Sequence, residues 1–363
     1  MRIRRVTILE FHRVFDRPLW NPATVWRERR APLLRLESDD GTIGLGEAWC
    51  RQDEIRYSFA ALHRLAAALP GRDLDDLRHA PASSRHDWVE AGAASAIDMA
   101  LWDMAARRDG RPLASFLGPT TTVAAYASGG LYGPDKDVSA LAREMAGYAA
   151  AGFAGVKMKI GGLDAAADLD RVAAVRAATG GALLIVDGVE RYDLATAARL
   201  AGALADRGVA AFQAPLPAAD IDGLAALARQ SPIPLVLGEA EFDHGRLVNL
   251  VTSGAAGWLQ ANPGLAGGPT GMAHLARIAR DHGVPLSPQA HATAVLQATA
   301  LHCGALHGVG WVEHHQVHDH LAGLLPPSLR RPTDGRIVIP PLPGLGFDLP
   351  SDGSLRTVFR LPD

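Results

Sequence analysis

The sequence predicts an α/β protein, a modified (βα)₈ barrel of the TIM type with a smaller α+β domain before it. From about residue 121, eight short apolar runs alternate with amphipathic segments of helical length. Polar residues stand at or just after the ends of these runs, at intervals of 23 to 30 residues. Each interval is about one strand plus one helix, so the polar residues keep in step with the predicted βα units.

The first 120 residues have a different rhythm. Residues 3–14 and 31–48 alternate apolar and polar side chains, and the second stretch contains the hairpin sequence SDDGT at 38–42. Between these two stretches, residues 15–26 are rich in aromatics and prolines, which favours a loop. Residues 54–116 have helical periodicity. We therefore expect a capping domain at 1–120 and a barrel at 121–324, with the tail 325–363 packing back on the first domain.

The barrel strands are predicted at the eight apolar runs, residues 123–128, 155–160, 182–187, 209–214, 233–239, 257–262, 284–289 and 309–314. Active sites of such barrels lie at the carboxyl ends of the strands. The polar residues there are Lys157, Lys159, Asp187, Gln213, Glu239, Asn262, Gln289 and Glu313. One or two such residues could simply begin solvent-exposed loops, but a whole series in register with the strands indicates an active site.

Composition and charge exclude several classes of protein. A net charge of −3 gives no electrostatic basis for nucleic-acid binding. No apolar run is long enough to span a membrane, and the N-terminus alternates instead of forming a signal-peptide core. The two cysteines, Cys50 and Cys303, make neither a disulfide framework nor a zinc motif. We expect a cytoplasmic protein whose partner is a small-molecule substrate.

Three stretches together resemble the enolase superfamily, in its mandelate racemase and muconate lactonizing branch. They are SAIDMALWDMAARRDGRPLASFLG at 95–118, GFAGVKMKIGG at 152–162 and IPPLPGLGFDL at 339–349. The resemblance implies a capping domain whose loops, near 15–30 and 50–56, close over the substrate. It also implies a homo-oligomer, either a dimer or an octamer. In this family, Mg²⁺ held by three carboxylates assists removal of a proton next to a substrate carboxylate.

Carried over by position, the resemblance places Asp187 and Glu239 on the first and third metal ligands, and Gln213 on the second. Lys159 falls on the catalytic base, Lys157 on a group that binds the substrate carboxylate, and Glu313 on the acid that bonds the intermediate. On the opposite face, the family's histidine and its orienting aspartate are here Gln289 and Asn262. Val189 stands where an asparagine often follows the first ligand.

These substitutions change the predicted chemistry. Two lysines and two carboxylates sum to zero charge without a metal, so Lys157 and Lys159 could pair directly with Asp187 and Glu239. We therefore expect no cofactor, or only weakly bound Mg²⁺. An amide cannot serve as a general base, and Asn262 is a natural hydrogen-bond partner for Gln289. Proton transfer would then use Lys159, with Lys157 and Glu313, on one face of the substrate.

Histidines near the end of the barrel leave several readings open. His291 could restore the missing base if the alignment shifts by two residues, or it could belong to the core or the surface. The run EHHQVHDH contains His314, His315, His318 and His320. It could be a metal site, it could supply a substrate contact from His314 or His315, or it could be a solvated loop.

The sequence supports three hypotheses of function. The first is a lyase or isomerase with a lysine-centred, metal-independent acid/base site that binds substrate through Gln213, Asn262, Gln289, His291 and His314. The second is a Mg²⁺-dependent acid-sugar dehydratase or one-base epimerase in which Gln213 is a weak ligand. The third is a ligand-binding descendant without catalysis, although two buried ammonium groups are costly to keep without a use.

Overall fold

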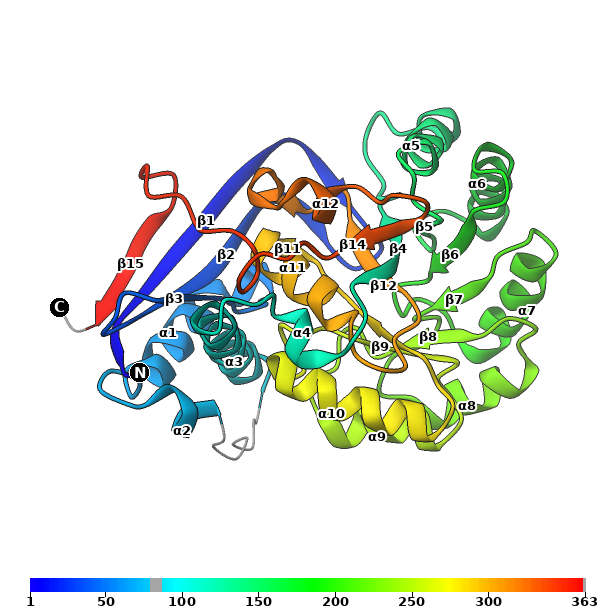
Figure 1. Cartoon of the computed structure of the whole chain (residues 1–363). Coiled ribbons are helices and arrows are strands. Elements are labelled where there is room, and N and C mark those ends of the chain that lie inside the picture. The colour runs from blue at the N-terminus through cyan, green and yellow to red at the C-terminus, as the bar shows by residue number, and fades with distance from the viewer. Residues whose placement is uncertain (79–86, 362–363) are drawn as a thin grey trace.

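The computed structural model describes residues 1–78 and 87–361. Figure 1 shows two parts side by side, a mixed domain at the left that contains both termini and a barrel of strands and helices at the right. The predicted fold class is confirmed. In the described residues, no helix is both long enough and apolar enough to cross a membrane.

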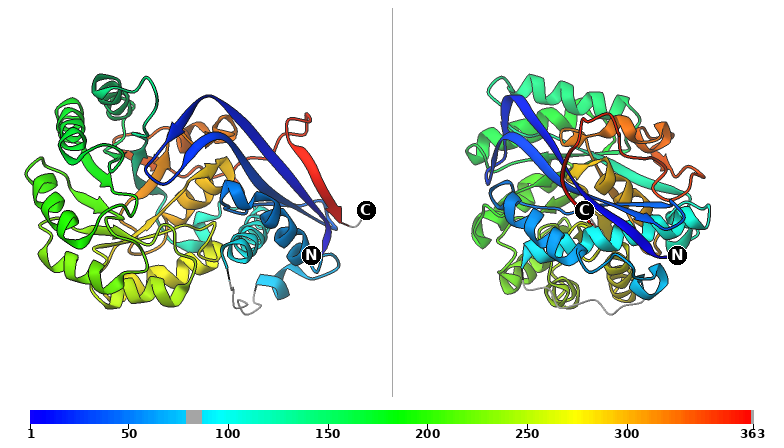
Figure 2. Two further views of the ribbon diagram at one scale, coloured as in Figure 1. Left: turned by 180° about the vertical axis from the view of Figure 1, so that it is seen from behind. Right: turned by 90° about the vertical axis from the view of Figure 1, so that its left-hand side faces the viewer.

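The capping domain is built on a four-stranded sheet in the order β15-β1-β2-β3. Its strands are β1 (Ile3–Trp20), β2 (Val25–Ser38), β3 (Ile43–Glu47) and β15 (Arg356–Leu361). All three pairings are antiparallel. Because β15 pairs with β1, the last strand of the chain lies beside the first, as Figure 2 shows. The predicted hairpin turn is present, with Gly41 in the left-handed region at φ 86°.

The segment predicted as a loop at residues 15–26 is mostly strand, so that prediction was wrong. β1 runs on to Trp20, and only residues 21–24 form the turn, where the Asn21 side chain accepts hydrogen bonds from two backbone amides. Trp20 stacks on Tyr132 of the barrel with ring centroids 4.3 Å apart, and the two residues exchange backbone hydrogen bonds. This tertiary contact extends the strand beyond its local preference.

Helices cover one face of the capping sheet. The helices of this part of the chain are η1 (Gln52–Glu54), α1 (Ile55–Ala66), α2 (Leu74–Arg78), α3 (Trp88–Arg108) and α4 (Ala114–Leu117), of which α1 and α3 pack on the sheet. α3 approaches β3 so closely that a Cβ at Gly46 would lie 1.9 Å from the Ala96 carbonyl oxygen. The sheet and α3 therefore pack through glycine and alanine.

Eight parallel strands form the barrel, at the positions that the apolar runs predicted. They are β4 (Thr122–Ser128), β5 (Gly155–Lys159), β6 (Leu183–Asp187), β7 (Ala211–Gln213), β8 (Leu235–Leu237), β9 (Trp258–Ala261), β10 (Leu286–Pro288) and β12 (Val312–His315). The hydrogen-bonded order follows the chain from β4 to β10, with β12 on the other side of β4. The curled sheet closes where the backbone of Leu286 bonds to Gly308 and Gly310, just before β12.

Helices between the strands form the outer layer. They are α5 (Val138–Ala150), α6 (Ala165–Ala178), α7 (Leu194–Ala205), α8 (Ile221–Gln230), α9 (His244–Thr252), α10 (Gly268–Asp281) and α11 (Ala294–Cys303). The first five begin after Asp137, Asp164, Asp193, Asp220 and Asp243, whose carboxylates each accept a hydrogen bond from the first helical turn. Such caps fix where each helix starts.

The C-terminal segment contacts both parts of the molecule. Its elements are η2 (Ala322–Leu324), α12 (Pro327–Arg330), β14 (Arg336–Val338) and β15. β14 pairs with β4 of the barrel, whereas β15 pairs with β1 of the capping sheet. Two further short strands, β11 (Ala292–Thr293) and β13 (Asp319–His320), pair with each other just beyond the barrel strands.

Candidate active site

A cavity of about 800 Å³ lies where the capping domain meets the carboxyl ends of the barrel strands. The turn at 21–25 and the segment 49–53 supply its wall on the capping side. These are the two loop regions that the family resemblance places over the substrate. The barrel side includes Lys159, Asp187, Gln213, Glu239, Gln289 and Glu313.

Strand alternation explains why the two lysines share the inner face of β5. Met158 between them is fully buried and packs with Val156 and Ile160 in the apolar layer under the helices. Lys157 and Lys159 therefore point the other way, into the barrel. The register of the sheet then pairs Lys159 with Asp187 on β6, and Asp187 with Gln213 on β7.

Lys157 is a buried cation held by barrel side chains. Its Nζ lies 2.7 Å from Glu313 Oε1 and donates a hydrogen bond of 2.9 Å to Gln213 Oε1, while Asp187 Oδ2 is 3.9 Å away. Only 1% of its surface is exposed. Burial by itself lowers the pKa of Lys157, but the charges of Glu313 and Asp187 outweigh it and raise that pKa. Lys157 therefore stays charged and is not on the cavity surface.

Lys159 reaches the cavity and forms an ion pair with Asp187. The second oxygen of Asp187 accepts a hydrogen bond of 2.9 Å from the backbone amide of Val189. The sequence suggested that the two lysines could pair with Asp187 and Glu239. Both lysines form ion pairs with Asp187, but Lys157 lies closer to Glu313, and neither lysine forms an ion pair with Glu239 in the described residues.

Glu239 is a partly exposed carboxyl group that lines the cavity. Burial, followed by repulsion from Asp187, raises its pKa from 4.5 to about 7, although Lys157 and a hydrogen bond from Gln213 act in the opposite direction. Near neutral pH this group exists in both protonation states, as a general acid or base must.

We expect Glu239→Gln to remove a pH-dependent loss of stability. Between pH 4.5 and 7 the folded state binds more protons at Glu239 than the unfolded state, so its contribution falls as pH rises. Relative to the variant, the wild type should lose about 3 kcal/mol between pH 4 and pH 8. Urea unfolding of both proteins across this range checks it, and parallel curves would contradict the raised pKa.

The donor atoms at the family's metal position do not fit Mg²⁺. Gln213 directs its amide oxygen to Lys157 and its amide hydrogens to Glu239. One oxygen of Asp187 is taken by Lys159 and the other by Val189. Mg²⁺ prefers charged oxygen ligands in octahedral geometry. Here the ligand positions already bind ammonium groups or amides.

The opposite face holds amides that do not bond to each other. Asn262 accepts a hydrogen bond of 2.7 Å from the Gly264 amide, its own Nδ2 has no partner in the described residues, and neither has Gln289 Oε1. The expected pairing of Asn262 with Gln289 was therefore wrong, because Asn262 instead forms the turn after β9. Gln289 lines the cavity, whereas Asn262 is fully buried and is not part of its lining.

The expected cavity contact of His314 is also contradicted. Its side chain packs on Phe153, 5.2 Å between ring centroids, and its Nε2 bonds to the Leu329 carbonyl oxygen. Because strand residues alternate, His314 points outward, and Glu313 and His315 line the cavity. The reading of EHHQVHDH as a solvated loop is wrong too, because all four histidines are at most 5% exposed.

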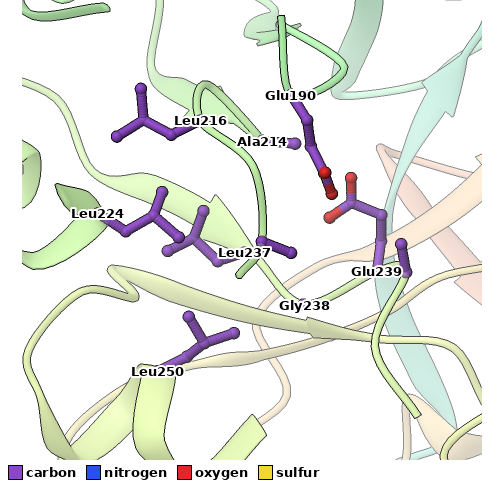
Figure 3. A pocket seen from close by; sticks show the side chains of 10 residues that line it. Glu190, Ala214, Leu216, Leu224, Leu237, Gly238, Glu239 and Leu250 are labelled. Carbon is purple, nitrogen blue, oxygen red and sulfur yellow. The ribbon is translucent and has the colours of Figure 1, made fainter. Parts of the chain in front are cut away.

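Sequence reasoning missed Glu190 and Arg29. Figure 3 shows the carboxylates of Glu190 and Glu239 facing each other, with leucines behind them. Glu190 has φ 58°, an uncommon conformation for this residue type. Burial, with the charges of Asp187 and Glu241, raises its pKa. Its position three residues after Asp187 was the available signal.

Comparisons with known proteins identify the family. Residues 4–118 match the family model of the mandelate racemase / muconate lactonizing enzyme N-terminal domain, and residues 139–353 match that of the enolase C-terminal domain-like family. D-galactarolactone cycloisomerase of Agrobacterium fabrum is 30% identical over 99% of this chain and 98% of its own. L-talarate/galactarate dehydratase of Salmonella typhimurium is 31% identical over 87% of this chain and 80% of its own.

A solved structure of L-talarate dehydratase from Polaromonas sp. JS666, complexed with Mg and L-glucarate, has a TM-score of 0.82 and 27% identity. The alignment covers 99% of this chain and 98% of that one. The matched relatives are lyases and isomerases. On its fold, its site and these matches, the protein belongs to the mandelate racemase and muconate lactonizing branch of the enolase superfamily, as an enzyme of the lyase or isomerase type.

Proposed function

We propose that the protein moves a proton at the carbon next to the carboxylate of a small hydroxy acid, such as an acid sugar, without a bound metal ion. The observation that carries this proposal is the site of the expected Mg²⁺ ligands, where lysines bind Asp187 and Gln213 directly. The relatives named above act on acid sugars or their lactones, which supports the substrate class.

Lys159 is the group that transfers the proton. It is the lysine that lines the cavity, and Asp187 holds its Nζ at the barrel mouth. In one direction its ammonium group donates a proton to the substrate carbon, and in the other its amine takes the proton back. Gln289 on the far side can hydrogen bond a substrate but cannot exchange a proton with it. The reaction therefore uses one face.

Glu239 supplies the second titratable group. With a pKa of about 7 it can donate a proton to a leaving hydroxyl group in a dehydration, or accept one from it in the reverse reaction. Lys157 and Glu313 act as positioning residues, since their ion pair fixes the amide of Gln213, which in turn bonds Glu239.

We expect chelation to leave both activity and stability nearly unchanged. A ligand that binds only the folded state raises its melting temperature, so removing a weakly bound metal has little effect. Protein dialysed against EDTA should turn over acid sugars in a dehydration or epimerisation screen as fast as untreated protein. A large drop in melting temperature or activity would support the Mg²⁺-dependent alternative, with Gln213 as a ligand.

The matched variant Gln213→Glu tests the same point in reverse. It adds a third carboxylate beside Asp187 and Glu239, which the family geometry uses for Mg²⁺. Calorimetric titration should show Mg²⁺ binding at least about tenfold tighter than in the wild type. Equal Mg²⁺ affinities of the variant and the wild type would mean that Lys157 and Lys159 stay bound to the carboxylates and exclude Mg²⁺ even when the third carboxylate is present.

A further inference from the structure

Three histidines from two segments meet at the cavity, which His291 and His315 line. His291, His315 and His318 each place one side-chain nitrogen within 4.8 Å of the others. The short pairing of β11 with β13 aligns the residues that follow His291 with those that follow His318. Trp26 of the capping hairpin packs edge-on against His291 and His318. We refer to His291, His315 and His318 as the histidine cluster.

Hydrogen bonds determine which nitrogen carries the proton in two of these rings. Arg13 can only donate, so the Nδ1 of His320, 3.5 Å from it, accepts, and the Nε2 of His320 carries hydrogen. That Nε2 lies 3.4 Å from His318 Nδ1, which therefore accepts, leaving the proton of His318 on Nε2. In His315, Nδ1 accepts from the amides of Val317 and His318, so its proton is also on Nε2.

The histidine cluster is therefore better suited to an anion than to a metal. A metal ion needs a lone pair on each ligating nitrogen, and the free nitrogens of His315 and His318 carry hydrogen instead. His318 Nε2 is buried and has no partner in the described residues, so it is a donor without an acceptor. Besides burial, His315, Arg29, His320 and Lys159 all lower the pKa of His318, as positive neighbours do, and such neighbours would repel a cation.

Arg29 adds a buried positive charge next to the cluster. Its side chain lines the cavity, the residue is 3% exposed, and one of its amino groups donates to the His291 carbonyl oxygen at 3.1 Å. Its Nε has no hydrogen-bond partner among residues 1–78 and 87–361. The nearby carboxylate of Glu47 is instead bonded to Thr293 and Leu296. A buried guanidinium in this setting is costly unless an anion joins it.

We propose that Arg29 and the histidine cluster form a carboxylate-binding site that holds the acid group of the substrate. The inference rests on the proposed function and deepens it, because it gives the substrate carboxylate a binding site that does not need a metal. One side-chain nitrogen of each ring lies within 4.8 Å of the others, a spacing that hydrogen bonds of about 2.8 Å to one carboxylate can span. Lys159 lines the same cavity, so a substrate held by its carboxylate lies within the reach of that lysine.

The test compares two probes that differ in a single group. D-galactonate carries a carboxylate where galactitol has a hydroxymethyl group, and binding of both is measured calorimetrically. The protein is the Lys159→Met variant, in which turnover is blocked but the histidine cluster is intact. We expect galactonate to bind at least about tenfold more tightly than galactitol, and Arg29→Met to remove this preference.

Arg246→Met is the matched control. Arg246 lines the same cavity, but its side chain is 55% exposed and lies 3.4 Å from Glu241, so its charge is already compensated. The preference for galactonate should change by no more than about twofold in this variant. If Arg29→Met does not fold, His318→Phe keeps the aromatic contacts and removes only the donor, and should weaken galactonate binding about threefold or more.

Several results would overturn the site. One is equal binding of galactonate and galactitol, or failure of both to bind at millimolar concentration. Another is a preference for galactonate that survives in Arg29→Met. Co²⁺ with a tetrahedral absorption spectrum that is lost in His318→Ala but not in Asp187→Asn would show a metal centre instead. Because binding is measured without turnover, wild-type activity on acid sugars tests the proposed function separately.

Discussion

Lys159→Met is expected to lower turnover of the acid-sugar substrate by about a thousandfold or more, the range for loss of an essential general acid or base. Lys159 is the lysine that reaches the cavity, and the opposite face offers the amide of Gln289 instead of a proton carrier. Methionine has a similar length but no ionisable group. Steady-state kinetics and exchange of the substrate's α-proton in D₂O should both show the loss.

Gln289→Ala provides the comparison. An amide at this position can orient the substrate but cannot exchange a proton with it, so its removal should cost far less than the loss of Lys159. Exchange of the α-proton that persists in Lys159→Met would contradict the one-face assignment. So would a larger loss from Gln289→Ala than from Lys159→Met. A wild type that binds acid sugars but never exchanges their protons would point to a non-catalytic descendant.

Lys157→Met is expected to be the most destabilising single change in the site. It leaves Glu313, 1% exposed, without the ammonium group that lies 2.7 Å from it, and it leaves Asp187 with Lys159 alone. Removing one partner of a buried ion pair typically costs about 3 to 5 kcal/mol, because an uncompensated charge stays buried. Urea denaturation monitored by circular dichroism measures the change in the free energy of unfolding.

A second substitution separates charge from packing. In Lys157→Met/Glu313→Gln, the carboxylate left without its partner becomes a neutral amide, so part of the lost stability should return. Groups in one ion-pair network usually couple by about 0.5 to 3 kcal/mol in such a cycle. Additive effects of the two substitutions would show that Lys157 acts mainly through packing, contrary to its contacts with Glu313 and Gln213.

The candidate site was predictable to the extent that it follows from strand position. Residues such as Asp187, Gln213 and Glu239 end successive strands, and parallel strands in a barrel bring such ends to one rim. The outward direction of His314 could also have been read from strand alternation, because Glu313 next to it faces inward. Glu190 lies beyond this rule, since its place depends on a left-handed turn after Asp187.

The sequence by itself determined the barrel, the order of its strands and the helix starts, because these depend on local periodicity and on capping residues a few positions away. Only the tertiary structure decided which charges pair. Lys157 selects Glu313, 156 residues later in the chain, because hydrogen bonds and ion pairs depend on distances of a few ångströms. The same holds for Arg29 and the histidine cluster. They meet only once the capping hairpin has docked on the barrel.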